Sequence, residues 1–287
     1  MTSVISGKTT VCGIIGDPVE HSMSPVMHNA AFGRLGMDFV YVPFHVKKEA
    51  LVRAVAGIRG LNIRGVNVTI PHKVAIMGLL DKIDPLAEKI GAVNTVVNDD
   101  GVLTGYNTDA TGFFGVLLEN GITVENKNVV IIGAGGVSRA VAFILGERGA
   151  KLTILNRNVE RANELGRRIS ELFGEVKVLE LNEGNMAAAL EKADILVNAT
   201  SVGMHPSVSD SPITAKLLRR GLTVCDLVYN PIETKLLKEA KAAGAPTIGG
   251  LDMLVWQGAL AFEKWTGRKA PIALMKKQAL KSLTHED

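Results

Sequence analysis

Cysteine and long apolar runs are scarce in this 287-residue sequence. Its two cysteines, Cys12 and Cys225, stand in short apolar stretches and lack the spacing of a metal site. We therefore expect two buried, reduced thiols and no metal site. No apolar stretch reaches the roughly 18 residues of a membrane span, and residues 1–8 lack the basic start and apolar core of a secretory signal. These absences favour a cytoplasmic protein without a membrane partner.

A strong charge of either sign is also missing. The sequence has 32 lysine and arginine residues against 29 aspartate and glutamate residues, which gives a formal net charge of +3. No block of basic residues occurs, so we expect no nucleic-acid partner, whereas small anionic molecules remain compatible with this balance. No Gly-x-Ser-x-Gly motif indicates a hydrolase. The 30 glycines, set against three tyrosines and two tryptophans, favour an α/β chain with many tight turns.

What the sequence does contain is a regular alternation of β-branched runs and helical patterns. We predict strands at 11–15, 39–42, 65–70, 93–97, 102–106, 129–132, 151–155, 176–179, 195–198, 222–226 and 246–248. We predict helices at 25–35 with Ser24 as its cap, from Pro71 onward, at 108–118, at 140–145, at 251–265 and from Pro271 onward. Residues 98–101 form a turn signal, so the strands on either side of them should pair as a hairpin.

A glycine-rich loop interrupts this alternation near the middle of the chain. Gly133, Gly135 and Gly136 follow the strand at 129–132 and precede the helical run at 140–145. Glycines let a backbone approach a pyrophosphate closely, and a helix N-terminus offers free N–H groups, so this context predicts a dinucleotide site. Ser138 stands where the usual fingerprint has its third glycine. A tight turn without a ligand is the alternative.

The strand that follows ends in Asn156, Arg157 and Asn158, with Arg161 one turn further on. An NAD-binding fold usually ends this strand in an acidic residue that holds the ribose 2′-hydroxyl. Here the acid is missing, and a guanidinium could bind a 2′-phosphate in fork geometry. The pattern therefore favours NADP. The alternative is a solvated helix start with an asparagine cap.

These patterns predict an α/β protein of two domains with mostly parallel sheets that are covered on both faces. Residues 1–110 would form a substrate-binding and catalytic domain, completed by the helices of residues 251–287, which pack back on it. Residues 111–250 would form a doubly wound, Rossmann-type domain that binds the dinucleotide.

Polar residues where a strand ends are candidates for chemistry, because ligands of open parallel sheets bind there. In the segment Asn67–Lys73, Lys73 would stand one turn into the predicted helix and could serve in acid–base catalysis. An exposed helix lysine is the alternative. Asp109 could pair with Lys73, although Thr108 or Asp109 could equally cap the next helix.

Ser22 and Ser24 carry a similar ambiguity. Two hydroxyl groups near a helix N-terminus can hold a carboxylate. Ser24 directly before Pro25 is also a good helix cap, so a purely structural role remains the alternative.

Eight ordered motifs then span nearly the whole chain: Ser22–Pro25, Asn67–Lys73, Gly91–Thr95, Gly105–Asp109, Gly133–Gly136, Asn156–Arg157, Asn198–Met204, and Gly249–Leu254 with Gln257. Through these motifs the chain resembles the shikimate dehydrogenase family, which includes shikimate/quinate dehydrogenases. The resemblance implies the fourth step toward chorismate, in which NADPH reduces 3-dehydroshikimate reversibly to shikimate. It also implies a catalytic pair at Lys73 and Asp109, with Ser22 and Ser24 on the substrate carboxylate.

The same resemblance implies two sets of binding residues and no metal. The substrate site would comprise Ser22, Ser24, Asn67, Thr69, Lys73, Asn94, Asp109, Tyr229 and Gln257. The NADP site would comprise Gly133, Ala134, Gly135, Gly136, Val137, Asn156, Arg157, Arg161, Thr200, Leu227 and Gly250.

Two other functions remain open. A quinate/shikimate dehydrogenase, often NAD-dependent, would have a broader substrate range, and Ser24 and Arg157 favour the shikimate enzyme over it. A non-catalytic NADP-binding sensor would need no proton relay, so the presence of both Lys73 and Asp109 argues against it. The expected assembly is a monomer or a homodimer.

Overall fold

The computed structural model describes residues 5–284 as two compact units. The first unit comprises the described residues up to Gly112 and those from Val255 onward, and the second comprises Phe113–Leu254. The chain passes from one unit to the other within helix α4 (Asp109–Glu119) and again within helix α9 (Gly250–Thr266). Residues 1–4 and 285–287, which the sequence assigns to the first domain, lie outside the described residues.

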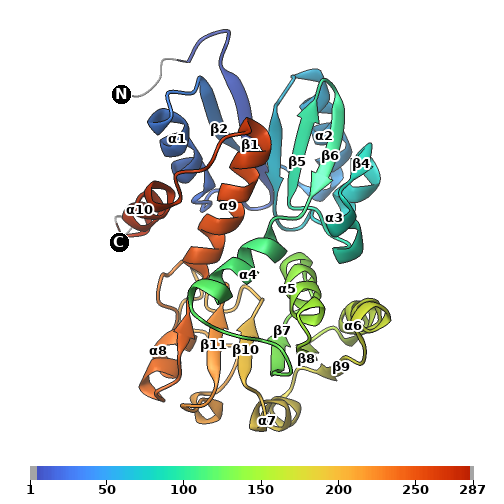
Figure 1. Ribbon diagram of the computed structural model, residues 1–287, viewed down its shortest axis with the longest axis vertical. Coiled ribbons are helices and arrows are strands. Elements are labelled where there is room, and N and C mark those ends of the chain that lie inside the picture. The colour runs from blue at the N-terminus through green and yellow to red at the C-terminus, as the bar shows by residue number, and fades with distance from the viewer. Residues whose placement is uncertain (1–4, 285–287) are drawn as a thin grey trace. The chain divides into compact units, whose positions relative to one another are not determined.

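The first unit contains a six-stranded sheet in the order β2-β1-β3-β5-β6-β4. Its elements, besides parts of α4 and α9, are β1 (Thr10–Gly16), α1 (Ser24–Arg34), β2 (Phe39–His45), η1 (Lys48–Ala50), α2 (Leu51–Gly60), β3 (Gly65–Val68), η2 (Ala75–Leu79), β4 (Lys82–Ile83), α3 (Pro85–Ile90), β5 (Thr95–Asp99), β6 (Val102–Tyr106) and α10 (Ile272–Leu283). Strand β1 runs parallel to β2 and β3, whereas β5 runs antiparallel to β3 and β6. The predicted hairpin at residues 98–101 is therefore confirmed, and this sheet is mixed (Figure 1).

The C-terminal helices pack on the first unit, as predicted. Helix α10 contacts α1, and the two lie side by side in Figure 1. In α9, the Trp265 indole Nε1 donates a hydrogen bond of 3.0 Å to the Val96 carbonyl of β5. A Cβ at Gly65 would lie 2.2 Å from that Nε1 atom, so only glycine lets the indole approach the sheet this closely.

Strand β2 forms one edge of this sheet, and the side chain of Asn29 covers part of it. The Asn29 amide donates to the Tyr41 carbonyl at 2.9 Å, and its oxygen accepts from the Tyr41 backbone N–H at 2.8 Å. One side-chain amide thus pairs with the strand edge as a peptide group of another strand would.

A histidine is buried beside the same tyrosine. His28 is 0% exposed, and its ring stacks on Tyr41 with centroids 4.5 Å apart. Neither ring nitrogen has a hydrogen-bond partner among residues 5–284. Burial without a partner disfavours the charged form, so the pKa of His28 falls from 6.5 to about 3.

This burial predicts an acid-dependent loss of stability. Unfolded His28 gains a proton near pH 6.5, and folded His28 gains one only near pH 3. Its contribution to stability is therefore present above pH 6.5 and is lost as the pH falls toward 3. Between pH 7 and pH 5 this loss is about 2 kcal/mol. Urea unfolding of wild type and His28→Leu at both pH values measures it, because the variant should lose about that much less. Equal losses would contradict the prediction.

The second unit is a doubly wound parallel sheet in the order β12-β11-β10-β7-β8-β9. Its elements, besides parts of α4 and α9, are β7 (Asn128–Ile132), α5 (Gly136–Glu147), β8 (Lys151–Asn156), α6 (Val159–Phe173), β9 (Lys177–Glu180), α7 (Glu183–Glu191), β10 (Ile195–Asn198), η3 (Ala215–Leu217), β11 (Thr223–Asp226), α8 (Lys235–Ala242) and β12 (Thr247–Ile248). The strand order reverses between β7 and β10, and such a reversal is where open α/β sheets bind ligands. No helix within residues 5–284 is long and apolar enough to cross a membrane.

Candidate active site

The polar candidates of the first unit lie at one end of its sheet, where its parallel strands have their carboxyl ends. Strands β1 and β3 run parallel, and β6 runs in the same direction because each of β3 and β6 is antiparallel to β5. The ends of β1, β3 and β6 and the beginning of β5 therefore lie at the same edge. The candidates follow these ends: Ser22 and Ser24 after β1, Thr69 and Lys73 after β3, Asn94 before β5, and Asp109 after β6.

The prediction of a helix from Pro71 is wrong, and Lys73 lies in a turn that precedes the short 3₁₀ helix η2. In an α-helix the Lys73 carbonyl would accept from the N–H of Met77. Instead it accepts from the N–H of Val93 at 2.8 Å, while Met77 donates to Val74. This contact anchors the turn to the segment before β5. Because no α-helix begins at Pro71, the alternative of an exposed helix lysine is also wrong.

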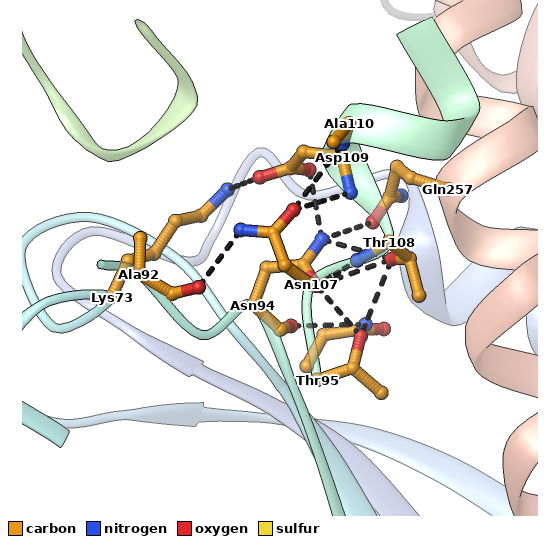
Figure 2. Close-up of polar contacts among 10 residues, drawn as sticks. Lys73, Ala92, Asn94, Thr95, Asn107, Thr108, Asp109, Ala110 and Gln257 are labelled. Atoms are coloured by element: carbon orange, nitrogen blue, oxygen red, sulfur yellow. Dashed lines mark hydrogen bonds and ion pairs between the residues drawn. The ribbon is translucent and has the colours of Figure 1, made fainter. Parts of the chain in front are cut away.

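Lys73 and Asp109 form an ion pair, as the sequence predicted. The Lys73 Nζ atom lies 2.6 Å from the Asp109 Oδ2 atom, and the two side chains are 14% and 5% exposed. Neither Thr108 nor Asp109 provides the cap of α4 through its side chain. The Asn107 side chain accepts from the N–H groups of Asp109 and Ala110 at 3.0 and 3.2 Å. The Asp109 carboxylate is therefore directed at Lys73 (Figure 2).

Asn94 connects this pair to the rest of the site. Its amide nitrogen donates to the Asp109 Oδ1 atom at 2.8 Å and to the Thr108 hydroxyl at 2.9 Å. Its amide oxygen accepts from the Thr108 backbone N–H at 2.8 Å. The Gln257 Oε1 atom, from α9, lies 3.5 Å from the same amide nitrogen, so Figure 2 shows Asn94 among groups from three segments of the chain.

Asn67 lies deeper, at 5% exposure. Its oxygen accepts from the Tyr41 hydroxyl at 2.7 Å, and its nitrogen donates to the Thr95 hydroxyl at 3.2 Å. Thr95 in turn donates to the Asn94 oxygen at 3.0 Å. Asn67 is therefore held by protein groups on both sides of its amide.

The prediction that Ser24 caps helix α1 is wrong. Ser24 is the first residue of the helix, and Met23 occupies the cap position without a side-chain cap hydrogen bond. The Ser24 backbone N–H donates to the Ser22 hydroxyl at 3.3 Å. Ser24 is 3% exposed, so its hydroxyl group is buried without serving the helix as a cap.

Of the predicted substrate residues, only Tyr229 belongs to the second unit, where it follows strand β11. Thr69 and Gln257 are half-buried members of the first unit. Within residues 5–284, no group of three or more His, Cys, Asp or Glu side chains could hold a metal ion.

The glycine loop of the second unit has the predicted strand–turn–helix context between β7 and α5. Gly133 has a φ of +113°, and a Cβ there would lie 2.9 Å from the Ala199 carbonyl oxygen. Only glycine combines this backbone conformation with such a close neighbour. A Cβ at Gly135 would meet nothing within 4 Å, so the loop has open space at the N-terminus of α5. Ser138 accepts from the Gly135 N–H at 3.1 Å and is buried, which explains a serine at this position.

A second polar cluster follows strands β10 and β11. The Asn198 amide donates to the Asp226 Oδ1 atom at 2.9 Å, and the Thr234 hydroxyl donates to the Oδ2 atom at 2.6 Å. Burial raises the pKa of Asp226 above its usual value, and its hydrogen bonds oppose that shift. The Thr200 hydroxyl donates to the Asn198 oxygen at 2.7 Å. These bonds fix both loops that carry predicted cofactor residues.

Two further predicted cofactor residues meet beside this cluster. The Leu227 N–H donates to the Asn198 carbonyl at 3.0 Å. A Cβ at Gly250 would lie 2.4 Å from the Leu227 carbonyl oxygen, so the start of α9 lies directly against this segment. The structure thus brings Thr200, Leu227 and Gly250 to the ends of β10 and β11.

The end of β8 carries the predicted basic residues. Asn156 donates to the Asn158 carbonyl at 2.8 Å, and the Asn158 side chain accepts from the Arg161 backbone N–H at 2.8 Å. Asn158 is therefore the cap of α6, as the structural alternative proposed. Arg157 and Arg161 remain exposed beside it, so a helix cap and an anion site are compatible at this position.

Several residues that shape the site were not assigned roles from the sequence. Asn107 caps α4, Tyr41 and Thr95 hold the two asparagines, and Asp226 joins the loops of the second unit. Thr95 stands in the motif Gly91–Thr95 and Asp226 ends a predicted strand, so each gave a positional signal. Tyr41 gave none, because it lies inside a β-branched and aromatic strand.

Comparison with known proteins agrees with this geometry. The family profile described as the shikimate dehydrogenase substrate binding domain matches residues 14–96. The profile described as shikimate / quinate 5-dehydrogenase matches residues 117–235, and the shikimate 5′-dehydrogenase C-terminal domain matches residues 250–280.

Individual proteins match over nearly the whole chain. The shikimate dehydrogenase (NADP⁺) of Methanothermobacter thermautotrophicus is 49% identical, over 99% of this chain and 100% of its own. A shikimate dehydrogenase solved in complex with NADP⁺ is 46% identical, with 99% of each chain covered and a TM-score of 0.92. The enzyme of Thermus thermophilus, solved with NADP(H) and shikimate, is 39% identical, with 96% of this chain and 100% of that chain covered and a TM-score of 0.86. The chain belongs to the shikimate dehydrogenase family.

Proposed function

We propose that this protein is an NADP-dependent oxidoreductase that converts 3-dehydroshikimate to shikimate and back, in the route to chorismate and the aromatic amino acids. The observation that carries this proposal is the buried pair of Lys73 and Asp109, whose Nζ and Oδ2 atoms lie 2.6 Å apart at the sheet edge where the candidate substrate residues gather. A sensor that only binds a dinucleotide would not need this pair.

The residues of the second unit fit a dinucleotide with a 2′-phosphate. The open space at Gly135 and the N-terminus of α5 suit a pyrophosphate, because backbone N–H groups and the helix dipole favour an anion there. Arg157 and Arg161 are exposed at the end of β8, and Asn156 stands where an NAD-binding fold has its acid. We assign the NADP site to these residues with Gly133, Ala134, Gly136, Val137, Thr200, Leu227 and Gly250.

The substrate site is assigned to residues Ser22, Ser24, Asn67, Thr69, Lys73, Asn94, Asp109, Gln257 and Tyr229. NADP(H), when bound, exchanges a hydride with the ring carbon that bears the reacting oxygen. The oxygen must gain a proton during reduction and lose one during oxidation. The Lys73 Nζ group can hold and pass this proton, and Asp109 keeps that group oriented through its own hydrogen bond.

A spectrophotometric assay at about 340 nm, where NADPH absorbs, tests the proposal. The purified protein should generate NADPH from shikimate and NADP, and the rate should be lower with quinate or with NAD. A preference for quinate and NAD would establish the quinate/shikimate alternative. NADP binding without turnover of either substrate would establish the sensor.

Ser22 and Ser24 are expected to hold the shikimate carboxylate. Replacing Ser24 by alanine should raise the KM for shikimate about 10- to 100-fold, the value of a hydrogen bond to a charged group. The melting temperature should stay near that of wild type, because Ser24 does not cap α1. Steady-state kinetics and thermal melting of Ser24→Ala, with Ser22→Ala as its companion, measure both quantities. An unchanged KM for both variants would place the carboxylate elsewhere.

We further propose that the protein acts in the cytoplasm as a monomer or a homodimer. Both cysteines, Cys12 and Cys225, are free and buried, and burial raises the pKa of each thiol to about 12. Thiols that stay protonated and buried are compatible with a reducing compartment such as the cytoplasm. Size-exclusion chromatography with light scattering distinguishes the two assemblies.

A further inference from the structure

A chain of hydrogen bonds runs through the first unit and ends on the Asp109 carboxylate. It begins at the Tyr41 hydroxyl and passes through Asn67, Thr95 and Asn94. Each of these side chains is 5% exposed or less, so protein groups determine where the protons lie. Tyr41 and Thr95 belong to neither the proposed substrate site nor the proposed cofactor site.

The direction of the first half follows from the orientation of the Asn67 amide. The Asn67 nitrogen lies 3.4 Å from the Asn94 carbonyl oxygen, which can only accept a hydrogen bond. The atom facing that carbonyl must therefore be the amide nitrogen, and the amide oxygen must face Tyr41. It follows that the Tyr41 hydroxyl donates to Asn67, and that Asn67 donates to the Thr95 hydroxyl.

The direction of the second half follows from the Thr108 backbone N–H, which can only donate. It lies 2.8 Å from the Asn94 oxygen, so the Asn94 nitrogen must face the Asp109 Oδ1 atom. The Thr95 hydroxyl accepts from Asn67, and of the two oxygens to which it can donate, that of Asn94 at 3.0 Å is nearer than the Thr108 hydroxyl at 3.3 Å. All links of the chain therefore donate toward Asp109 (Figure 2 shows its last part).

We propose that Tyr41 and Thr95 are positioning residues for the catalytic pair. Their hydroxyl groups add to the backbone contacts that hold the amides of Asn67 and Asn94 in one orientation. The Asn94 amide then occupies the Oδ1 atom of Asp109 and leaves the Oδ2 atom on Lys73. Donors aligned in one direction also polarise one another, which strengthens the last bond to the carboxylate.

This role rests on the proposed function, because the pair it positions is the proposed catalytic pair. The wild-type assay with shikimate and NADP separates the two. If the wild type is inactive, the proposed function itself is wrong. If the wild type is active and the variants have the same kcat, only the positioning role is wrong.

The decisive variant is Thr95→Val, which removes the hydroxyl group at nearly constant volume. We expect kcat to fall about 3- to 10-fold, the range for one neutral hydrogen bond. The KM values for shikimate and NADP should change less than about 2-fold, because Thr95 itself belongs to neither the proposed substrate site nor the proposed cofactor site. Thr95→Ser keeps the hydroxyl group, and its kcat should stay near that of wild type. An unchanged kcat in Thr95→Val, a rise in KM alone, or an equal loss in Thr95→Ser would overturn the proposal.

Tyr41→Phe tests the other end of the chain and keeps the ring that stacks on His28. We expect it to lower kcat by about 2- to 5-fold, while the matched control Tyr106→Phe leaves kcat unchanged. Thr95→Val already interrupts the chain, so adding Tyr41→Phe to it should cost nothing further. Losses that multiply in the double variant would show independent effects and overturn the proposal. If Thr95→Val does not fold, an unchanged kcat in Tyr41→Phe overturns it alone.

Discussion

Replacing Lys73 by methionine should lower kcat for shikimate oxidation by about 10²–10⁴-fold, the usual contribution of a positioned acid–base group. Methionine keeps much of the length of the side chain and removes the Nζ group that lies 2.6 Å from Asp109. The KM for shikimate should change much less, because the proton transfer is completed only in the transition state. Steady-state kinetics in both directions, with circular dichroism as the check on folding, measure this loss.

The companion variant Asp109→Asn shows whether the two residues act as one unit. It should also slow turnover strongly, and the double variant should lose little more than the worse single variant. Asp109→Asn keeps the size of the side chain and removes its charge, so it also controls for the cost of leaving a buried carboxylate without its lysine. Near-normal kcat in a folded Lys73→Met protein would take Lys73 out of the mechanism. Losses that multiply would contradict a coupled pair.

Arg157→Ala should weaken NADP binding by about 10- to 100-fold, the value of one charge-assisted hydrogen bond to phosphate. Arg157 is exposed at the end of β8, beside Asn156, where no acid competes for the 2′-phosphate. NAD has no 2′-phosphate, so its affinity should hardly change. Titration of both cofactors against wild type and variant, followed by protein fluorescence or calorimetry, measures the two affinities at one salt concentration.

Arg167→Ala is the matched control for this experiment. Arg167 is also exposed and lies on α6, the helix that Asn158 caps, so its loss changes the net charge by the same amount. We expect it to leave the ratio of NADP to NAD affinity unchanged. A wild-type preference for NAD, or equal losses of both cofactors in Arg157→Ala, would favour the quinate/shikimate alternative instead.

Much of this site follows from local patterns in the sequence. The glycine loop between β7 and α5 is predictable because the strand, turn and helix are contiguous, and so is the hairpin of β5 and β6. The pairing of Lys73 with Asp109 is different, because local pattern leaves a helix cap at Asp109 equally good and only the family resemblance favours the pair that the structure shows. The basic residues that follow β8 are predictable because they are contiguous with that strand in the sequence.

Other features depend on contacts that no local pattern contains. Pro71 and Ser24 are good helix signals, yet the Lys73 carbonyl bonds to Val93, and Ser24 starts its helix without capping it. The role of Tyr41 depends on the order of β2, β1 and β3, which brings its hydroxyl to Asn67 from another strand. Tertiary hydrogen bonds of this kind override local preference.

The pairing of Asn29 with strand β2 has a consequence for self-association. An edge strand is a template on which another chain can add, and the two Tyr41 backbone groups that such a chain would use are occupied by the Asn29 amide. The hydroxyl of the same tyrosine begins the hydrogen-bond chain to Asp109. Strand addition at this edge would have to displace Asn29 from the backbone of this residue, so the Asn29 amide opposes aggregation through β2.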